Sequence, residues 1–303
     1  MGNAMIGMLL ISAGLIVHQF EAILVKQYGK KYGSGGMFFN AIICLFAMVY
    51  FFVTDKGGLQ FSSGIIIYGL INSLMYAVGF YAAYLAYRCG SFGLTRLLTS
   101  FSSIIPVFFG IIFLKEEPTS YFTYPALFLI FLSLFLMNYQ GKEQQSGSGA
   151  ELQKNQKLSI KWIIFVILII ISNAMISIIS KIKVDNLGKD LNNEYLIICY
   201  AGASLGLFIL GFIFERNSFR TTIKQGFLYG ASAGIFNGIN NLLILVTYEY
   251  LPISFISPVK TGLGMVISFM LSIFLYKEKF SRRQLISAGI GIVAIILMNI
   301  KIG

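Results

Sequence analysis

The chain has 303 residues, of which 57% are hydrophobic and only 12% are charged. A soluble domain carries about twice that share of charged residues, so a lipid bilayer is the expected environment of this chain. The formal net charge of +11 does not indicate a nucleic-acid partner. Nearly all Lys and Arg lie between or near the ends of apolar runs, where basic residues anchor helices at lipid headgroups.

Apolar runs of roughly 17–25 residues are long enough to cross a bilayer as helices. We expect helices because the runs are too long and too uniformly apolar for the tilted strands of a membrane barrel. Ten such runs occur, and we predict spans at residues 4–25, 34–54, 64–87, 92–114, 121–139, 160–181, 194–214, 226–249, 253–276 and 283–300. The predicted fold class is therefore an all-α multi-pass membrane protein.

A polar, glycine- and serine-rich linker at residues 141–158 divides the chain into halves of five spans, residues 1–140 and 159–303. The halves share short motifs at an offset of 161 positions, which indicates an internal repeat. Tyr68-Gly69 returns as Tyr229-Gly230, Tyr87 as Tyr248, and Leu136-Met137-Asn138 as Leu297-Met298-Asn299. Because five is an odd number, the second half would enter the membrane from the opposite side, which gives two inverted repeats.

The motif FLKEE (113–117) at the end of the fourth span is answered by FLYKEK (274–279) at the end of the ninth. With ten spans in two five-span halves, these Lys-Glu pairs make the chain resemble the EamA branch of the drug/metabolite transporter superfamily. The resemblance covers essentially the whole chain. It implies a transporter of small molecules and says little about the substrate.

Two lines of argument about membrane orientation disagree. The loops after the odd-numbered spans hold most of the loop Lys and Arg, which places both termini outside the cell by the positive-inside rule. The family resemblance implies that both termini lie in the cytoplasm. The orientation is left open.

The residue inventory argues against an enzyme. His18 is the only histidine, which excludes the HExxH metal motif and leaves a serine nucleophile with one candidate base. The glycine-lysine signature of a phosphate-binding loop is absent. The three cysteines lie far apart in the sequence and are interpreted as small packing residues. We expect no catalytic residue, no cofactor and no metal.

The first span carries His18, Gln19 and Glu21 within an apolar run, and His18 and Glu21 share one helical face. Ionisable side chains inside a membrane are costly and usually functional. In one interpretation Glu21 couples transport to protons or another ion, influenced by His18, and His18 and Gln19 contact the substrate. In the other, Glu21 pairs with a neighbouring cation, and His18 only packs.

Polar stripes at helical spacing run along four further spans and are expected to face a shared cavity. Spans one, three, four, six, eight and nine would line it. The substrate-binding candidates on spans three, six and eight are Asn72, Tyr76, Tyr84, Asn173, Asn237 and Asn241. Interhelical hydrogen bonding without substrate contact is the alternative for each amide.

Spans four and nine each present a cation on a hydroxyl-bearing face, and the candidates are Arg96, Thr99, Lys260 and Thr261. The two cations would bind a carboxylate or phosphate of a substrate, with Arg96 suited to a bidentate contact. Alternatively, a carboxylate such as Glu21 or Glu249 neutralises one of them, and the pair only fastens helices together.

The sequence thus predicts a secondary active transporter of a small metabolite or drug-like molecule in the cell membrane, working by alternating access and coupled to protons. Its partners would be the lipid bilayer, the substrate and a coupling ion, and the oligomeric state a monomer or homodimer. Two alternatives stay open. One is an exporter of lipophilic or quaternary cations, with Glu21 as counter-ion. The other is a non-transporting membrane scaffold or receptor.

Overall fold

The computed structural model describes residues 2–32, 36–55, 57–89, 95, 98–99, 101–116, 122–138, 160–188, 191–276 and 282–299. Helices dominate these residues, and none of them lies in a strand. The α-helices are α1 (Gly2–Tyr32), α2 (Met37–Thr54), α3 (Ser63–Cys89), α5 (Ile104–Ile112), α6 (Thr123–Asn138), α7 (Ile160–Leu187), α8 (Asn192–Phe214), α9 (Phe219–Thr247), α10 (Ile253–Tyr276) and α11 (Arg282–Asn299). Two 3-10 turns, η1 (Phe101–Ser103) and η4 (Arg216–Ser218), precede α5 and α9.

Six segments of the described chain are long and apolar enough to cross a membrane, which confirms a multi-pass membrane protein. They are Ala4–Gly29, Met37–Thr54, Ser63–Ala86, Ile160–Leu187, Asn192–Phe214 and Arg216–Thr247. Helices α5, α6 and α10 fall within three of the other four predicted spans, and α11 matches the fourth to within one residue at each end. That these four also cross the membrane, which would make ten spans, stays a prediction.

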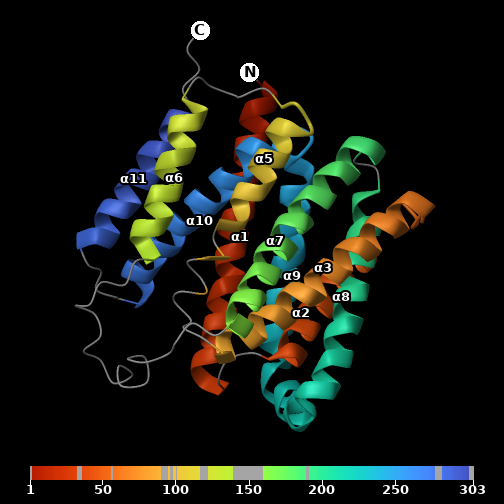
Figure 1. The fold of residues 1–303 in the computed structure, drawn as a ribbon. Coiled ribbons are helices and arrows are strands. Elements are labelled where there is room, and N and C mark those ends of the chain that lie inside the picture. Colours follow the sequence, from red (N-terminus) through yellow and green to blue (C-terminus); the bar gives the residue numbers. More distant parts are fainter. Residues whose placement is uncertain are drawn as a thin grey trace.

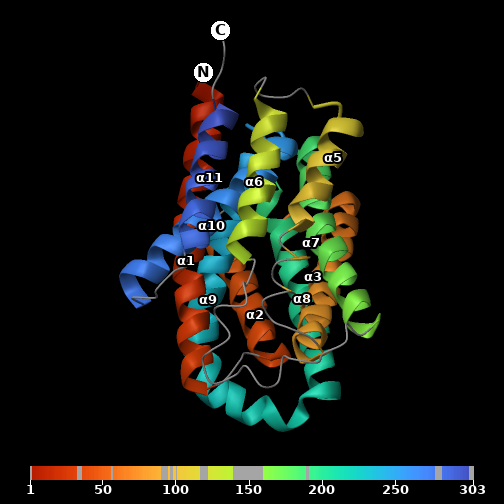
Figure 2. The ribbon, with the colours of Figure 1, turned by 60° about the vertical axis from the view of Figure 1, so that its left-hand side comes forward.

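Most of the closely packed helix pairs join the first half of the chain to the second. Helix α1 packs against α9, α3 against α7 and α8, and α2 against α8 and α9. Helices α6 and α11 form a further pair, and α5 packs on α10 (Figures 1 and 2). The start of α1 and the end of α11 lie at the same end of the bundle. The two halves are therefore interleaved.

Small residues allow these helices to approach closely. A methyl group added at Gly234 of α9 would overlap the carbonyl oxygen of Ile43 on α2, and one added at Gly202 of α8 would overlap Ser73 on α3. Glycine is required at such contacts because membrane helices associate by van der Waals packing rather than by excluding water. Outside the bundle, large apolar side chains such as Leu228 (77% exposed) face the surroundings, as expected for a surface in contact with lipid.

Candidate functional site

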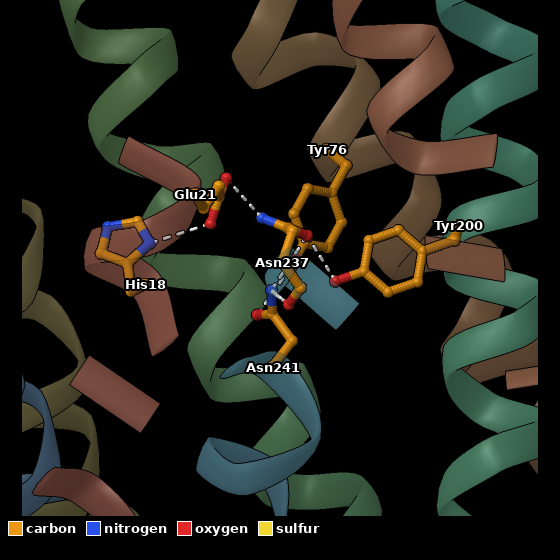
Figure 3. A network of polar contacts seen from close by, with 6 residues as sticks. All are labelled: His18, Glu21, Tyr76, Tyr200, Asn237 and Asn241. Atoms are coloured by element: carbon orange, nitrogen blue, oxygen red, sulfur yellow. Dashed lines mark hydrogen bonds and ion pairs between the residues drawn. The ribbon is translucent and has the colours of Figure 1, made fainter. Parts of the chain in front are cut away.

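Glu21 on α1 lies at one end of a hydrogen-bonded network inside the bundle (Figure 3). Its Oε2 lies 2.9 Å from Nδ1 of His18, one turn earlier on the same helix. Its Oε1 accepts a hydrogen bond of 2.9 Å from the side-chain amide of Asn237 on α9. The side chain of Glu21 is 12% exposed and that of His18 is 46% exposed, so the histidine stands between the buried carboxylate and the surface.

The network continues from Asn237 to two further helices (Figure 3). Oδ1 of Asn237 accepts hydrogen bonds from the hydroxyl of Tyr200 on α8, at 2.7 Å, and from Nδ2 of Asn241, at 3.2 Å. Oδ1 of Asn241 in turn accepts from the hydroxyl of Tyr76 on α3, at 3.3 Å. Four helices from both halves of the chain thus contribute to one polar cluster.

The donors of this network all point toward Glu21. Tyr76 donates to Asn241, Asn241 to Asn237, and Asn237 to the carboxylate. An ionised carboxylate only accepts hydrogen bonds, so this order suits a charged Glu21. A proton placed on Oε1 would compete with the Asn237 donor and disturb the chain of bonds as far as Tyr76.

A narrow cavity adjoins the network where α3, α7, α8, α9 and α10 meet. It is lined by Asn72, Tyr76, Ile176, Ser177, Ser180, Leu196, Asn241, Ile244, Leu245, Tyr248 and Lys260. Tyr76 and Asn241 belong to both features, so they connect the cavity to Glu21. The cavity volume of about 30 Å³ is room for roughly one water molecule, far less than the 300–1,000 Å³ of common ligand sites.

Lys260 on α10 contributes a cation to the cavity wall. Its side chain is half-buried, and among the described residues it has neither a hydrogen bond nor an ion pair. The hydroxyl of the neighbouring Ser257 is buried and also lacks a hydrogen-bonding partner there. Thr261 instead donates back to the carbonyl of Ser257 at 2.9 Å, so its hydroxyl is used within α10.

The structure brings together about half of the residues that the sequence suggested. His18, Glu21, Asn72, Tyr76, Asn237, Asn241 and Lys260 lie in the network or in the cavity wall. Gln19 is buried, and Tyr84, Thr99 and Thr261 are half-buried, but none of these four lines the cavity. Asn173 lies on an exposed face of α7. Arg96 lies outside the described residues.

Several site residues were missed by the sequence reasoning, above all Tyr200 and Tyr195 of α8. The seventh span was not expected to line the cavity, yet Leu196 of α8 does so, and Tyr200 joins the network. One signal could have found the tyrosines. A buried tyrosine hydroxyl needs a hydrogen-bonding partner, so tyrosines within an apolar run indicate a polar neighbour.

Glu116, in the Lys-Glu pair after α5, connects the two halves at the start of α10. Its carboxylate accepts hydrogen bonds of 2.9 Å from the backbone amides of Ile253 and Ser254, which satisfies two free donors of that helix terminus. Lys115, directly before Glu116, adopts a left-handed backbone conformation with φ of 51°, which turns the chain after α5. Glu116 therefore caps the start of α10.

The part of the chain that the structure describes contains no group of three His, Cys, Asp or Glu side chains that could hold a metal ion. Cys44 and Cys199 are buried and unpaired. The chemistry that the described cluster offers is therefore acid–base exchange at Glu21 and hydrogen bonding in the cavity.

Comparison with known proteins supports the family suggested by the Lys-Glu motifs. Residues 156–300 match the EamA-like transporter family. No curated protein sequence matches the chain. Among solved structures, 28 chains match. One, described only as the crystal structure of a protein, has a TM-score of 0.75 at 12% identity and covers 98% of this chain and 96% of its own. At that identity the likeness shows the fold alone.

Proposed function

Because residues 156–300 carry an EamA-like transporter domain, we propose that the whole chain is a secondary active transporter of a small metabolite or drug-like molecule. A solved structure resembles the fold over 98% of the chain. The six long apolar helices place the protein in a membrane. We assign it to the cell membrane as part of the same proposal.

The pairing of helices supports two inverted repeats. In the two repeats, α1 corresponds to α7, α2 to α8, α3 to α9, α5 to α10 and α6 to α11. When each helix is exchanged for its counterpart in the other half, the α1–α9 contact becomes α7–α3, and α2–α9 becomes α8–α3. Both members of each set occur. The pairs α2–α8, α5–α10 and α6–α11 are their own counterparts. In such transporters the substrate site lies between the repeats, where the cavity is found here.

The observation that carries the proposal is the continuous network from Glu21 to the cavity wall. Burying a carboxylate within an apolar helix costs free energy, and proton relays of transporters use such groups. Protonation of Glu21 would remove the charge that Asn237 and Asn241 are oriented toward. The proton site and the substrate site would then bias one another through Tyr76, as coupled transport requires.

The size of the cavity supports alternating access. Space for about one water molecule cannot hold a metabolite, so binding requires the helices around it to move apart. The two interleaved halves can rock against each other at the contacts of α3 with α7 and of α5 with α10. The described conformation then corresponds to a nearly closed state.

Lys260 supports a substrate with a carboxylate or phosphate group, because it lines the cavity and has no anionic partner within contact distance among the described residues. That Arg96 also binds the anionic group of the substrate stays a prediction. A cation exporter is the alternative. Tyr76 and Phe80 stack with their ring centroids 6.4 Å apart beside the network, and ring faces with Glu21 could bind a quaternary amine.

A ligand-stabilisation screen of the purified protein tests this proposal. Organic anions, amino acids and quaternary amines would be compared at two pH values, because a compound that binds the native state raises its melting temperature. We expect organic anions to stabilise the protein, and Lys260→Gln to abolish the effect. Stabilisation by quaternary amines that depends on Glu21 and tolerates Lys260→Gln would favour the cation exporter. The transporter proposal fails if the compounds that bind the protein are not transported across the membrane of proteoliposomes that contain it.

A further inference from the structure

Two residues of the cavity wall carry polar groups without described partners, and the chemistry of these groups restricts the substrate. One is the ammonium of Lys260, and the other is Oδ1 of Asn72 on α3. Asn72 is 2% exposed, and its Oδ1 is buried. A buried carbonyl oxygen without a hydrogen bond costs free energy, so a ligand that donates to it would be favoured.

Hydrogen bonds around Asn72 fix which end of its amide is unsatisfied. The hydroxyl of Ser180 donates to the backbone carbonyl of Ile176 at 2.8 Å, so its oxygen is left to accept hydrogen bonds. Tyr195 can then donate to Ser180, 3.0 Å away, which leaves the oxygen of Tyr195 as an acceptor. Nδ2 of Asn72 donates to Tyr195 and to Ser180.

This chain of donors ends on the backbone carbonyl of Ile176, which can only accept a hydrogen bond. The direction of the chain is therefore set. Turning the amide of Asn72 around would oppose its carbonyl oxygen to the acceptor oxygen of Ser180. Nδ2 therefore stays on the side of α7 and α8. Oδ1 is left as a fixed acceptor on a residue that lines the cavity.

We propose that this cavity, once the helices around it have moved apart, binds a small hydroxycarboxylate, with its carboxylate on Lys260 and its hydroxyl donating to Oδ1 of Asn72. The proposal rests on the transport function proposed above and specifies its substrate class. A simple carboxylate would leave Oδ1 of Asn72 unsatisfied. A doubly ionised phosphate monoester has no phosphate hydrogen to donate to this carbonyl oxygen.

The charge of the cavity wall favours a hydroxyl over an ammonium as the donor. Among the described residues that line the cavity, Lys260 is the one charged side chain, and none is a carboxylate. An amino acid would bring a second positive charge close to Lys260 with only the neutral carbonyl of Asn72 to receive it. Hydroxyls of Ser177 and Tyr248 in the same wall suit further hydroxyl groups of the ligand.

Two matched sets of compounds test the proposal on the full chain in lipid nanodiscs. Lactate, propionate and alanine differ only in the group beside the carboxylate, and 3-hydroxybutyrate, butyrate and 3-aminobutyrate repeat the comparison at a longer spacing. Binding would be measured by calorimetry. In at least one set we expect the hydroxy acid to bind about tenfold more tightly than the other two members, since a lost hydrogen bond leaves Asn72 unpaired.

Variants of Asn72 separate this role from a general loss of structure. Asn72→Ala should lower hydroxy-acid affinity to that of the simple acid and leave the simple acid unchanged. Asn72→Asp should reverse the preference toward the amino acid, because it supplies a carboxylate for the ammonium. Asn186→Asp is the matched control, since Asn186 is exposed and bonds to Tyr68 outside the cavity. It should keep the wild-type preference.

The proposal is overturned if the simple acid or the amino acid binds as tightly as the hydroxy acid in both sets. It is also overturned if folded Asn72→Ala and Asn72→Asp proteins, identified by wild-type elution and a cooperative melt, keep the hydroxy-acid preference. Failure of the transport function has a different signature. In that case hydroxy acids bind with the expected preference, yet proteoliposomes do not accumulate them.

Discussion

Asn237 on α9 donates a hydrogen bond of 2.9 Å from its side-chain amide to Oε1 of Glu21 on α1. This bond joins the first helix of one half to the third helix of the other. It also gives the buried carboxylate a partner on each oxygen, because His18 lies 2.9 Å from Oε2. Glu21 is thereby fixed in a position from which a change in its charge reaches four helices.

Replacing Asn237 should therefore destabilise the protein. Asn237→Leu has a similar volume but leaves Oε1 of Glu21 and the hydroxyl of Tyr200 without their partner, and we expect a loss of about 1–3 kcal/mol in the free energy of unfolding. Tyr200→Phe removes one bond and should cost less, about 0.5–1 kcal/mol. Melting curves in one detergent would check the order. Equal stability of Asn237→Leu and wild-type protein would contradict the assigned network.

Glu116 should contribute more to stability than an exposed ion pair does. Glu116→Gln removes the charge that caps α10, and we expect a cost of about 1 kcal/mol, since the helix dipole and two backbone donors favour a carboxylate there. The control is Asp185→Asn, which breaks an exposed ion pair with Lys181 and should cost about 0.5 kcal/mol or less. A larger effect of the control would argue against the cap.

Two glycines allow a matched test of helix packing. Gly234→Ala would push its methyl group into the carbonyl oxygen of Ile43, and we expect a loss of about 1–3 kcal/mol as α2 and α9 separate. No described atom lies within 4 Å of a methyl group added at Gly289 of α11. Gly289→Ala should therefore be neutral or slightly stabilising. Thermal melting of both variants measures the difference, and similar losses would contradict the close contact at Gly234.

The helices could be predicted from the sequence because hydrophobic length is a local property. Six of the predicted spans coincide with helices that can cross a membrane, although α1 and α9 extend beyond the predicted ends. The spacing of His18 and Glu21 likewise predicted that they share a face, and they form a contact. Both predictions depend only on residues within a single helix.

Contacts between helices could not be predicted in the same way. Tyr200 joins the network because α8 packs against α2 and α9, and nothing within the seventh span reveals that packing. Asn173 resembles the other amides in sequence, yet the rotation of α7 places it on an exposed face. Asn72 was suggested by its stripe, but its fixed acceptor depends on Tyr195 and Ser180 from two other helices.

Proton flux through Glu21 tests the central claim most directly. Proteoliposomes containing an internal pH indicator would receive the compound that stabilises the protein most, with Glu21→Gln compared against wild type. Glu215→Gln is the matched control, because Glu215 is a carboxylate that binds the backbone amide of Met37 outside the network. We predict that wild type and Glu215→Gln move protons with the compound and that Glu21→Gln binds it without moving protons. Transport by Glu21→Gln at the wild-type rate and with the wild-type pH dependence would contradict the account.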